Sequence, residues 1–315
     1  MPPVCSAVGA ATPTLPAAPS TTRVTRPSSP NSDAPLRLRP RPDAAARHRM
    51  SLRGWLVDRL LLKQPRVRRW LTRLLEGDRD TDVSLLHTPV HVNTIREHGY
   101  LRASRMIARS SFLNDEVSAL LAIAGLLPEA DAFVDVGANV GIYSKILHRF
   151  AAIHPDLRFY AFEADPDTAR RLAVTLAGTK VELFAHAVGD RETELEFARG
   201  AVSHVSTRRD LATRYQLDET FKVRCRPLDA VGLVGRNLVL KIDVEGQELA
   251  VLQGAAGLFA AGRVRAVFLD GAADGAEVAA FLRRHGLDFY DARTLRPAAD
   301  LPYALLALRR PVPAP

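Results

Sequence analysis

The sequence predicts an α/β fold in which helices flank a mostly parallel sheet of seven strands, preceded by an N-terminal helical extension. From residue 133 onward, short apolar segments alternate with amphipathic segments of helix length. This alternation is typical of parallel strands joined by right-handed helical crossovers. The first apolar segment also runs into a glycine-containing turn, which is where α/β sheets commonly bind ligands.

The chain is expected to divide into three parts, beginning with residues 1–48. That segment is dominated by Pro, Ala, Ser and Arg and contains few large apolar side chains. Because it cannot bury enough surface to offset the entropy of ordering, we expect a disordered tail. Residues 49–111 follow as a basic helical extension with an irregular cap, and residues 112–310 form the α/β domain.

Two short basic amphipathic helices are expected on either side of Pro65. Apolar residues recur at helical spacing before it and again from Val67 to Leu75. One interpretation is an anchor on a membrane surface, with Trp and Leu side chains inward and arginines toward anionic headgroups. The more common alternative is a helix pair that covers one side of the core and leaves a basic face in solvent.

The remaining elements follow from apolar periodicity and turn residues. A helix capped by Asn114 and Asp115 should direct apolar side chains to the core, namely Val117, Leu120, Leu121 and Ile123. The strands of the sheet are expected at 133–136, 158–163, 181–187, 237–244, 265–269, 287–291 and 303–309. The helices between them are expected at 140–150, 166–176, 247–258 and 277–284. Two exposed strands, 192–198 and 221–226, should enclose a polar segment.

The net charge of +8 lies in the N-terminal part of the chain. Residues 1–80 contain 15 Lys and Arg against 6 Asp and Glu, whereas residues 81–315 contain 28 against 29. A neutral α/β body does not favour a basic groove, so no nucleic-acid partner is expected.

Cys5 and Cys225 are the two cysteines, which provide neither a disulfide framework nor a metal-binding pattern. The N-terminus lacks the basic start and continuous apolar core of a secretory signal. The longest apolar run, near residues 119–127, is well below the ~18 residues of a membrane span. A cytoplasmic, reducing location is the simplest expectation.

The strand at 133–136 contains an acidic residue and leads into an open turn. Gly137 and Gly141 supply the flexible backbone, and amide groups at the following helix start would point at a ligand. Asp135 should accept hydrogen bonds from loop amides, water or a ligand's ammonium group, because an unpaired buried carboxylate is costly. A turn without a ligand is the alternative.

The spacing of this turn bears on the cofactor. A dinucleotide site needs G-x-G-x-x-G, but the second and third glycine positions counted from Gly137 hold Asn139 and Ile142. These side chains would crowd a pyrophosphate, whereas S-adenosylmethionine has none. The turn, with Gly137, Asn139 and Gly141, therefore favours S-adenosylmethionine.

Two further acids follow the next strands. Glu163 ends the second strand, 26 residues after Gly137, where a carboxylate can accept both ribose hydroxyls. A helix-capping role is the alternative, although it fits Asp165 better, because that residue directly precedes Pro166. After the third strand, residues 187–190 offer small apolar side chains for an adenine and Asp190 for its amino group. A Gly-Asp pair is also an ordinary turn.

Three charged residues occur near the end of the strand at 237–244. Strand alternation places Lys241, Asp243 and Glu245 on one face. A central parallel strand is normally apolar on both faces, so this departure indicates a functional site at the carboxyl edge of the sheet. A structural ion pair of Lys241 with one of the acids is the alternative.

Four segments together resemble the FkbM-type methyltransferases. They are Val-Asp-Val-Gly-Ala-Asn-Val-Gly at 134–141, Phe-Glu-Ala-Asp-Pro at 162–166, Ala-Val-Gly-Asp at 187–190 and Leu-Lys-Ile-Asp-Val-Glu-Gly-Gln-Glu at 240–248. The resemblance covers roughly residues 112–270 and implies a class I methyltransferase (Rossmann-like) fold. It also implies S-adenosylmethionine as donor and a hydroxyl of a sugar, polyketide or related metabolite as acceptor. Two departures stand out: Ala164-Asp165 replaces the commoner Pro-Asn, and Asp270 stands where Glu is frequent.

Methyl transfer requires in-line alignment and removal of the hydroxyl proton. We expect Asp243 or Glu245 to be the base or to orient the hydroxyl, with Lys241 holding the pair in register. A divalent cation bound by the two acids is an alternative, although no dedicated metal motif is present. His204 is a further candidate, but a lone loop histidine is more often a surface residue.

Two other function classes stay open from the sequence. One is an NAD-dependent oxidoreductase, which the missing glycines disfavour. The other is a non-catalytic binding protein with a methyltransferase-like fold, whose basic arm would dock on an anionic surface. The expected acceptor is a small molecule or a glycan- or lipid-linked group, and the oligomeric state is open.

Overall fold

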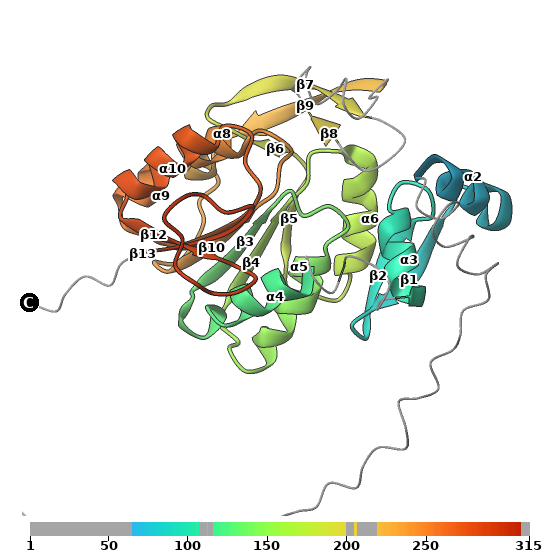
Figure 1. Cartoon of the computed structure of the whole chain (residues 1–315), viewed down its shortest axis with the longest axis horizontal. Helices are drawn as coiled ribbons and strands as arrows, with labels where there is room; N and C mark the ends of the chain where they lie inside the picture. Colours follow the sequence, from blue (N-terminus) through green and yellow to red (C-terminus); the bar gives the residue numbers. More distant parts are fainter. Residues whose placement is uncertain (1–64, 107–111, 113–115, 200–204, 207–218, 310–315) are drawn as a thin grey trace, which may run out of the picture. The chain divides into compact units, whose positions relative to one another are not determined.

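A seven-stranded sheet forms the centre of the computed structural model (Figure 1). The strand order is β12-β13-β11-β10-β3-β4-β5. The strands are β3 (Ala132–Val136), β4 (Arg158–Phe162), β5 (Glu182–Phe184), β10 (Leu238–Ile242), β11 (Val264–Asp270), β12 (Leu287–Asp291) and β13 (Ala304–Arg309). Strand β13 runs antiparallel to both of its neighbours, β12 and β11, and the five strands β11, β10, β3, β4 and β5 run parallel to one another. The predicted seven-stranded, mostly parallel sheet is confirmed.

The structure describes residues 65–106, 112, 116–199, 205–206 and 219–309. All of them belong to one unit of the chain, residues 52–315. The tail predicted for residues 1–48, the first of the two basic helices, the Asn114–Asp115 cap and His204 lie outside the described residues.

Helices cover both faces of the sheet (Figure 1). One face, which includes Val134 and Leu240, packs against α8 (Glu248–Gln253), α9 (Ala256–Ala260) and α10 (Gly275–Arg284). The opposite face, which includes Phe133 and Val239, packs against α4 (Glu116–Ala124) and α5 (Ile142–Leu147). The predicted helix at 247–258 is thus two helices, and the one at 140–150 is α5 followed by a 3-10 helix, His148–Ala152. Leu121 of α4 was expected in the core but is 69% exposed, because this short helix is apolar on nearly all sides.

A second, four-stranded sheet of order β6-β9-β7-β8 contains the strands predicted as exposed. Its members are β6 (Ala187–Val188), β7 (Thr193–Arg199), β8 (Val205–Ser206) and β9 (Glu219–Arg226). The predicted strand at 181–187 is wrong as a single element, because β5 pairs in the central sheet and β6 pairs in this one. An apolar run alone does not specify which sheet each half will join.

The N-terminal part contains more regular structure than its sequence pattern indicates. The second basic helix is confirmed as α2 (Pro65–Glu76). It precedes an antiparallel hairpin of β1 (Asp80–Leu85) and β2 (Thr88–Asn93), and then α3 (His98–Met106). The two-residue turn between the strands consists of Leu86 and His87 with φ of 49° and 58°. Such turns normally use Asn-Gly, so the usual hairpin signal is missing from the sequence.

A buried ion pair joins this hairpin region to α6 (Pro166–Leu176). Arg171 donates to Glu97 at 2.9 Å, and their side chains are 6% and 0% exposed. Burial raises the pKa of Glu97, against the opposing charge of Arg171. Arg171 also donates to the Thr168 hydroxyl at 3.1 Å. The hairpin region is therefore held against the helix that follows β4.

Candidate active site

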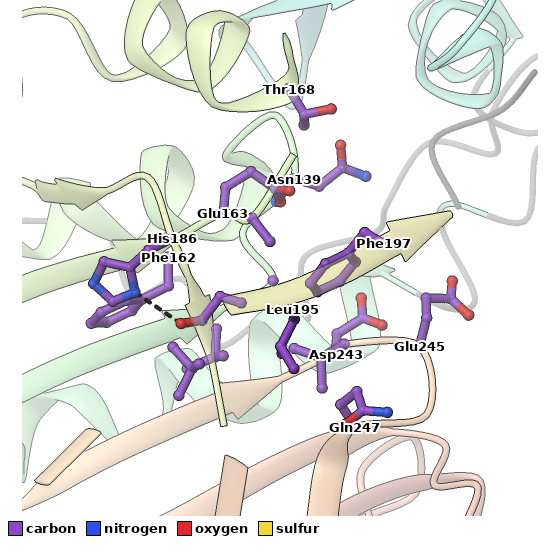
Figure 2. Close-up of a pocket in the computed structure, with 16 residues that line it drawn as sticks. Asn139, Phe162, Glu163, Thr168, His186, Leu195, Phe197, Asp243, Glu245 and Gln247 are labelled. Atoms are coloured by element: carbon purple, nitrogen blue, oxygen red, sulfur yellow. Dashed lines mark hydrogen bonds between the residues drawn. The ribbon is translucent and has the colours of Figure 1, made fainter. Parts of the chain in front are cut away.

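A cavity lies at the carboxyl ends of β3, β4 and β10, where parallel sheets bind ligands (Figure 2). It contains about 780 Å³ of space, including the open solvent at its mouth. Glu163, Asp243 and Glu245 supply carboxylates to its lining. The uncharged lining residues are Val136, Gly137, Asn139, Phe162, Ala164, Thr168, His186, Ala187, Val188, Leu195, Phe197, Val244 and Gln247.

The glycine turn brings two distant segments into contact. Gly137 has φ of +76°, and a Cβ built on it would lie 1.9 Å from the backbone oxygen of Asp243. Only glycine permits this approach, which seats the segment after β10 directly against the turn. The amide groups of Gly137 and Ala138 donate to the Phe162 carbonyl at 3.0 and 2.9 Å. The turn is therefore anchored on both β4 and β10.

The other two predicted turn residues differ in their placement. Asn139 lines the cavity and has φ of 51°, a left-handed conformation that asparagine tolerates better than most residues. Gly141 does not line the cavity; it precedes α5 with φ of +86°, and a Cβ there would lie 2.5 Å from Leu172 Cδ1. Gly141 thus permits close packing of the turn on α6.

Glu163 lies at the cavity, as predicted, and its carboxylate already accepts two backbone hydrogen bonds. The Asn139 amide donates to Oε2 at 2.9 Å, and the Asp165 amide donates to Oε1 at 2.8 Å. Burial raises the pKa of Glu163 to about 7, although these amides favour the ionised form. Asp165 caps α6 by accepting from the amides of Asp167 and Thr168. The capping role therefore belongs to Asp165, as the sequence favours, whereas Glu163 lines the cavity.

Asp135 and Lys241 form a buried pair beneath the turn instead of lining the cavity. Register pairs the two residues across β3 and β10, and Lys241 Nζ lies 3.2 Å from Asp135 Oδ1. Asp135 also accepts from the Ser144 hydroxyl at 2.7 Å and amide at 3.2 Å. An amide therefore does stabilise Asp135, as the sequence predicts. Asp135 itself does not line the cavity, and its side chain is 0% exposed.

Lys241 connects this pair to the cavity. Its ammonium donates to the Gly137 carbonyl at 2.7 Å and lies 3.6 Å from Asp243 Oδ2. Burial opposes its charge, but Asp135 and Asp243 outweigh that effect and raise the pKa of Lys241. Lys241 is therefore a permanent cation that holds the turn and Asp243 together.

Asp243 and Glu245 both line the cavity, but from the loop after β10, which ends at Ile242 and not at Val244 as predicted. The Asp243 side chain is 42% exposed. Desolvation by the surrounding protein nevertheless raises the pKa of its carboxyl group, and the charge of Lys241 partly offsets this effect. Glu245 has φ of 50°. Strand alternation therefore does not explain why both acids reach the cavity; the loop conformation does.

Asp190 lies away from the cavity. Its carboxylate pairs with Arg191 at 2.9 Å, and its side chain is 39% exposed. The neighbouring Ala187 and Val188 do line the cavity, so the apolar half of this predicted site is present without its acid.

Sequence reasoning missed several lining residues: Thr168, His186, Leu195, Phe197 and Gln247. Leu195 and Phe197 alternate with Glu194 and Glu196 along β7. That period of two marks an apolar face, and it could have identified these residues in the sequence. They form an apolar wall contributed by the second sheet (Figure 2).

A second polar group adjoins Lys241 on the α4 and α5 side of the sheet. The Tyr143 hydroxyl donates to the carboxylate of Glu116, and Lys241 Nζ lies 5.2 Å from the centre of the Tyr143 ring. Burial raises the pKa of Glu116 to about 7. No sequence signal distinguished these residues from the apolar helix faces that carry them.

Within the described ranges, no three His, Cys, Asp or Glu side chains are grouped so that they could hold a metal ion.

Comparison with known proteins identifies the family. Residues 135–289 match the family model described as Methyltransferase FkbM domain. No curated protein matches the chain.

Three similar solved structures are distant in sequence. A TehB-like SAM-dependent methyltransferase from Corynebacterium glutamicum is 13% identical, with 67% of this chain and 96% of that chain covered and a TM-score of 0.36. A SAM-dependent methyltransferase from Aquifex aeolicus is 10% identical, with 64% of this chain and 91% of that chain covered and a TM-score of 0.34. M. capricolum TrmK in complex with S-adenosyl-homocysteine is 9% identical, with 60% of this chain and 65% of that chain covered and a TM-score of 0.29.

The sheet order, the glycine turn and the family match agree with one another. The predicted class I methyltransferase fold is confirmed, and with it S-adenosylmethionine-dependent methylation as the general activity. Through residues 135–289, the chain belongs to the FkbM methyltransferase family.

Proposed function

We propose that this protein transfers the methyl group of S-adenosylmethionine to a hydroxyl of a sugar, polyketide or related metabolite, free or linked to a glycan or lipid. The negative charge of the cavity lining is the main observation that supports S-adenosylmethionine as the donor. Three carboxylates line it, and among the described lining residues there is no lysine or arginine. A cationic sulfonium is stabilised by these carboxylates, whereas the pyrophosphate of NAD would be repelled.

The cavity also matches the other parts of this donor. Glu163 keeps unused lone pairs on both oxygens, so it can accept from ribose hydroxyls while holding its two amides. Asn139 Oδ1 is buried and has no hydrogen-bond partner among the described residues, so it needs a donor such as an ammonium group. Ala187, Val188 and Phe197 offer an apolar surface for the adenine.

Asp243 is the proposed base for the acceptor hydroxyl. When bound, the donor supplies an electrophilic methyl group for in-line transfer. Asp243 reaches the cavity and its pKa is raised, which makes its carboxylate a stronger proton acceptor than an ordinary aspartate. Lys241 holds Asp243 in position, and Glu245 orients the hydroxyl from the same loop. A divalent cation shared by Asp243 and Glu245 is the alternative route, which loss of activity with EDTA would support.

Isothermal titration calorimetry of the full-length chain with S-adenosylmethionine and with NAD tests the donor. We expect a one-to-one enthalpy change with the first and none with the second. Binding of NAD alone would instead favour an oxidoreductase, and binding of neither would favour a non-catalytic protein. Mass spectrometry of metabolites after deletion of the gene, searching for species that have lost one methyl unit, identifies the acceptor and tests whether oxygen carries the methyl group.

The affinity for S-adenosylmethionine should increase as pH rises through about 7, because Glu163 is protonated below its pKa of about 7. An ionised Glu163 accepts hydroxyl hydrogen bonds and attracts the sulfonium, so affinity should change by at most about tenfold per pH unit. The folded pKa exceeds the ordinary value of 4.5, so this group favours the folded state at low pH and loses that contribution as pH rises between these values.

Calorimetry across this pH range provides the measurement. Glu163→Gln should bind more weakly and lose the pH dependence. Glu116→Gln is the matched control, since Glu116 has a similar pKa but does not line the cavity. If the pH dependence disappeared with Glu116→Gln and not with Glu163→Gln, the assignment of Glu163 would be wrong.

A further inference from the structure

Helix α2 presents large apolar side chains to solvent. Trp70, Leu74 and Leu75 are 62%, 66% and 77% exposed. Comparable residues of α10, such as Val278 and Leu282, are 0% exposed. An apolar surface of this kind on a folded protein marks a site of interaction. We call these three residues the α2 apolar face.

The helical spacing of this face makes it continuous. Trp70 and Leu74 are four residues apart and therefore stand one above the other. Leu75 adjoins Leu74, and Val67 and Leu71 extend the same side and are partly buried. The helix has 12 residues, a length of about 18 Å, which is shorter than the ~30 Å hydrocarbon core of a bilayer. It can therefore lie along a membrane surface but not across it.

The charge of α2 identifies the kind of surface. Its sequence, PRVRRWLTRLLE, contains four arginines and one glutamate, with no acid in its first turn. Arg73 is 64% exposed although it pairs with Asp78 at 3.2 Å. The whole region from residue 1 to 80 has nine more basic than acidic residues. An apolar face beside a cationic one complements lipid tails and anionic headgroups at once.

Other kinds of partner would match only one of the two features of α2, either its arginines or its exposed apolar side chains. Nucleic acid would use the arginines but leave the leucines in water. A second copy of the helix would cover the leucines but bring like charges together. Tryptophan, which has an apolar ring and a polar N–H, is favoured at the boundary between lipid and water.

We propose that α2 binds peripherally to an anionic membrane surface, with Trp70, Leu74 and Leu75 inserted between the lipids. This inference concerns where the enzyme works and is independent of the acceptor proposed above. Its test does not use catalysis, so it can fail while the methyltransferase assignment holds.

Fluorescence of the full-length chain provides the test, because the sequence contains two tryptophans, Trp55 and Trp70. In the Trp55→Phe variant, Trp70 is the sole reporter. Vesicles of phosphatidylcholine mixed with phosphatidylglycerol should shift its emission to shorter wavelength and sediment with the protein. Vesicles of phosphatidylcholine alone should do neither, and high salt should weaken binding to the anionic vesicles.

Variants then assign the contact to the α2 apolar face. Replacing Leu74 and Leu75 by Ser should weaken vesicle binding by at least about tenfold. Ile153→Ser is the matched control, since Ile153 is 78% exposed but follows α5 in the α/β domain. An unshifted Trp70 spectrum with anionic vesicles would overturn the proposal. Unchanged vesicle binding by the double variant would also overturn it. So would the finding that the unaltered protein self-associates in solution and that the double variant is monomeric, because a second copy of the chain would then cover this face.

Discussion

Replacing Asp243 by Asn is expected to lower turnover by a factor of about 10²–10⁴, the range that a general base contributes. The substitution keeps the size of the side chain and removes its capacity to accept the hydroxyl proton. Affinity for S-adenosylmethionine should change much less, because Glu163 and the glycine turn remain in place. The ratio of methylated to unmethylated acceptor in a complemented deletion strain, together with calorimetry of the donor, measures the two effects.

Two companion variants make this result specific. Asp190→Asn should leave turnover unchanged, since Asp190 pairs with Arg191 outside the cavity. Glu245→Gln should reduce turnover with donor binding largely intact, as expected for a residue that orients the acceptor. If Asp243→Asn retained full turnover while Glu245→Gln abolished it, Glu245 would be the base.

Replacing Lys241 by Met should destabilise the protein by about 3–5 kcal/mol, the cost of leaving one member of a buried ion pair without its partner. Asp135 is 0% exposed, so water cannot compensate for the lost cation. Lys241 also holds the Gly137 carbonyl at 2.7 Å, so the turn beneath the donor should loosen and donor affinity should fall. Urea unfolding measures the first effect and calorimetry the second.

A double-mutant cycle separates the pair from the general loss of a side chain. Adding Asp135→Asn to Lys241→Met should recover part of the lost stability, because no unpaired charge then stays buried. Lys180→Met, at an exposed position, should change stability by no more than about 0.5 kcal/mol. If the double variant were as unstable as the sum of the single ones, the coupling between Lys241 and Asp135 would be absent.

Local pattern was sufficient for most of the α/β domain. Helix α6 has the predicted bounds, because Asp165 caps it and Pro166 begins it. Local pattern was insufficient for the hairpin of β1 and β2, because its turn residues Leu86 and His87 are unusual at positive φ. It also failed at 181–187, where one apolar run divides between two sheets.

The sequence by itself determined the fold class, the family, and the three acids of the cavity, Glu163, Asp243 and Glu245. The acids follow from residue types at or just after strand ends, because the carboxyl ends of parallel strands meet at one edge, whereas the family follows from the resemblance of four motif segments. Only the tertiary structure decided that Lys241 and Asp135 lie beneath this edge while Asp190 lies outside it. Their partners come from segments about a hundred residues apart or from side-chain directions in loops, which no local period encodes. The contact of Gly137 with the Asp243 carbonyl is of the same kind, because it arises when two separate turns are brought together by the sheet.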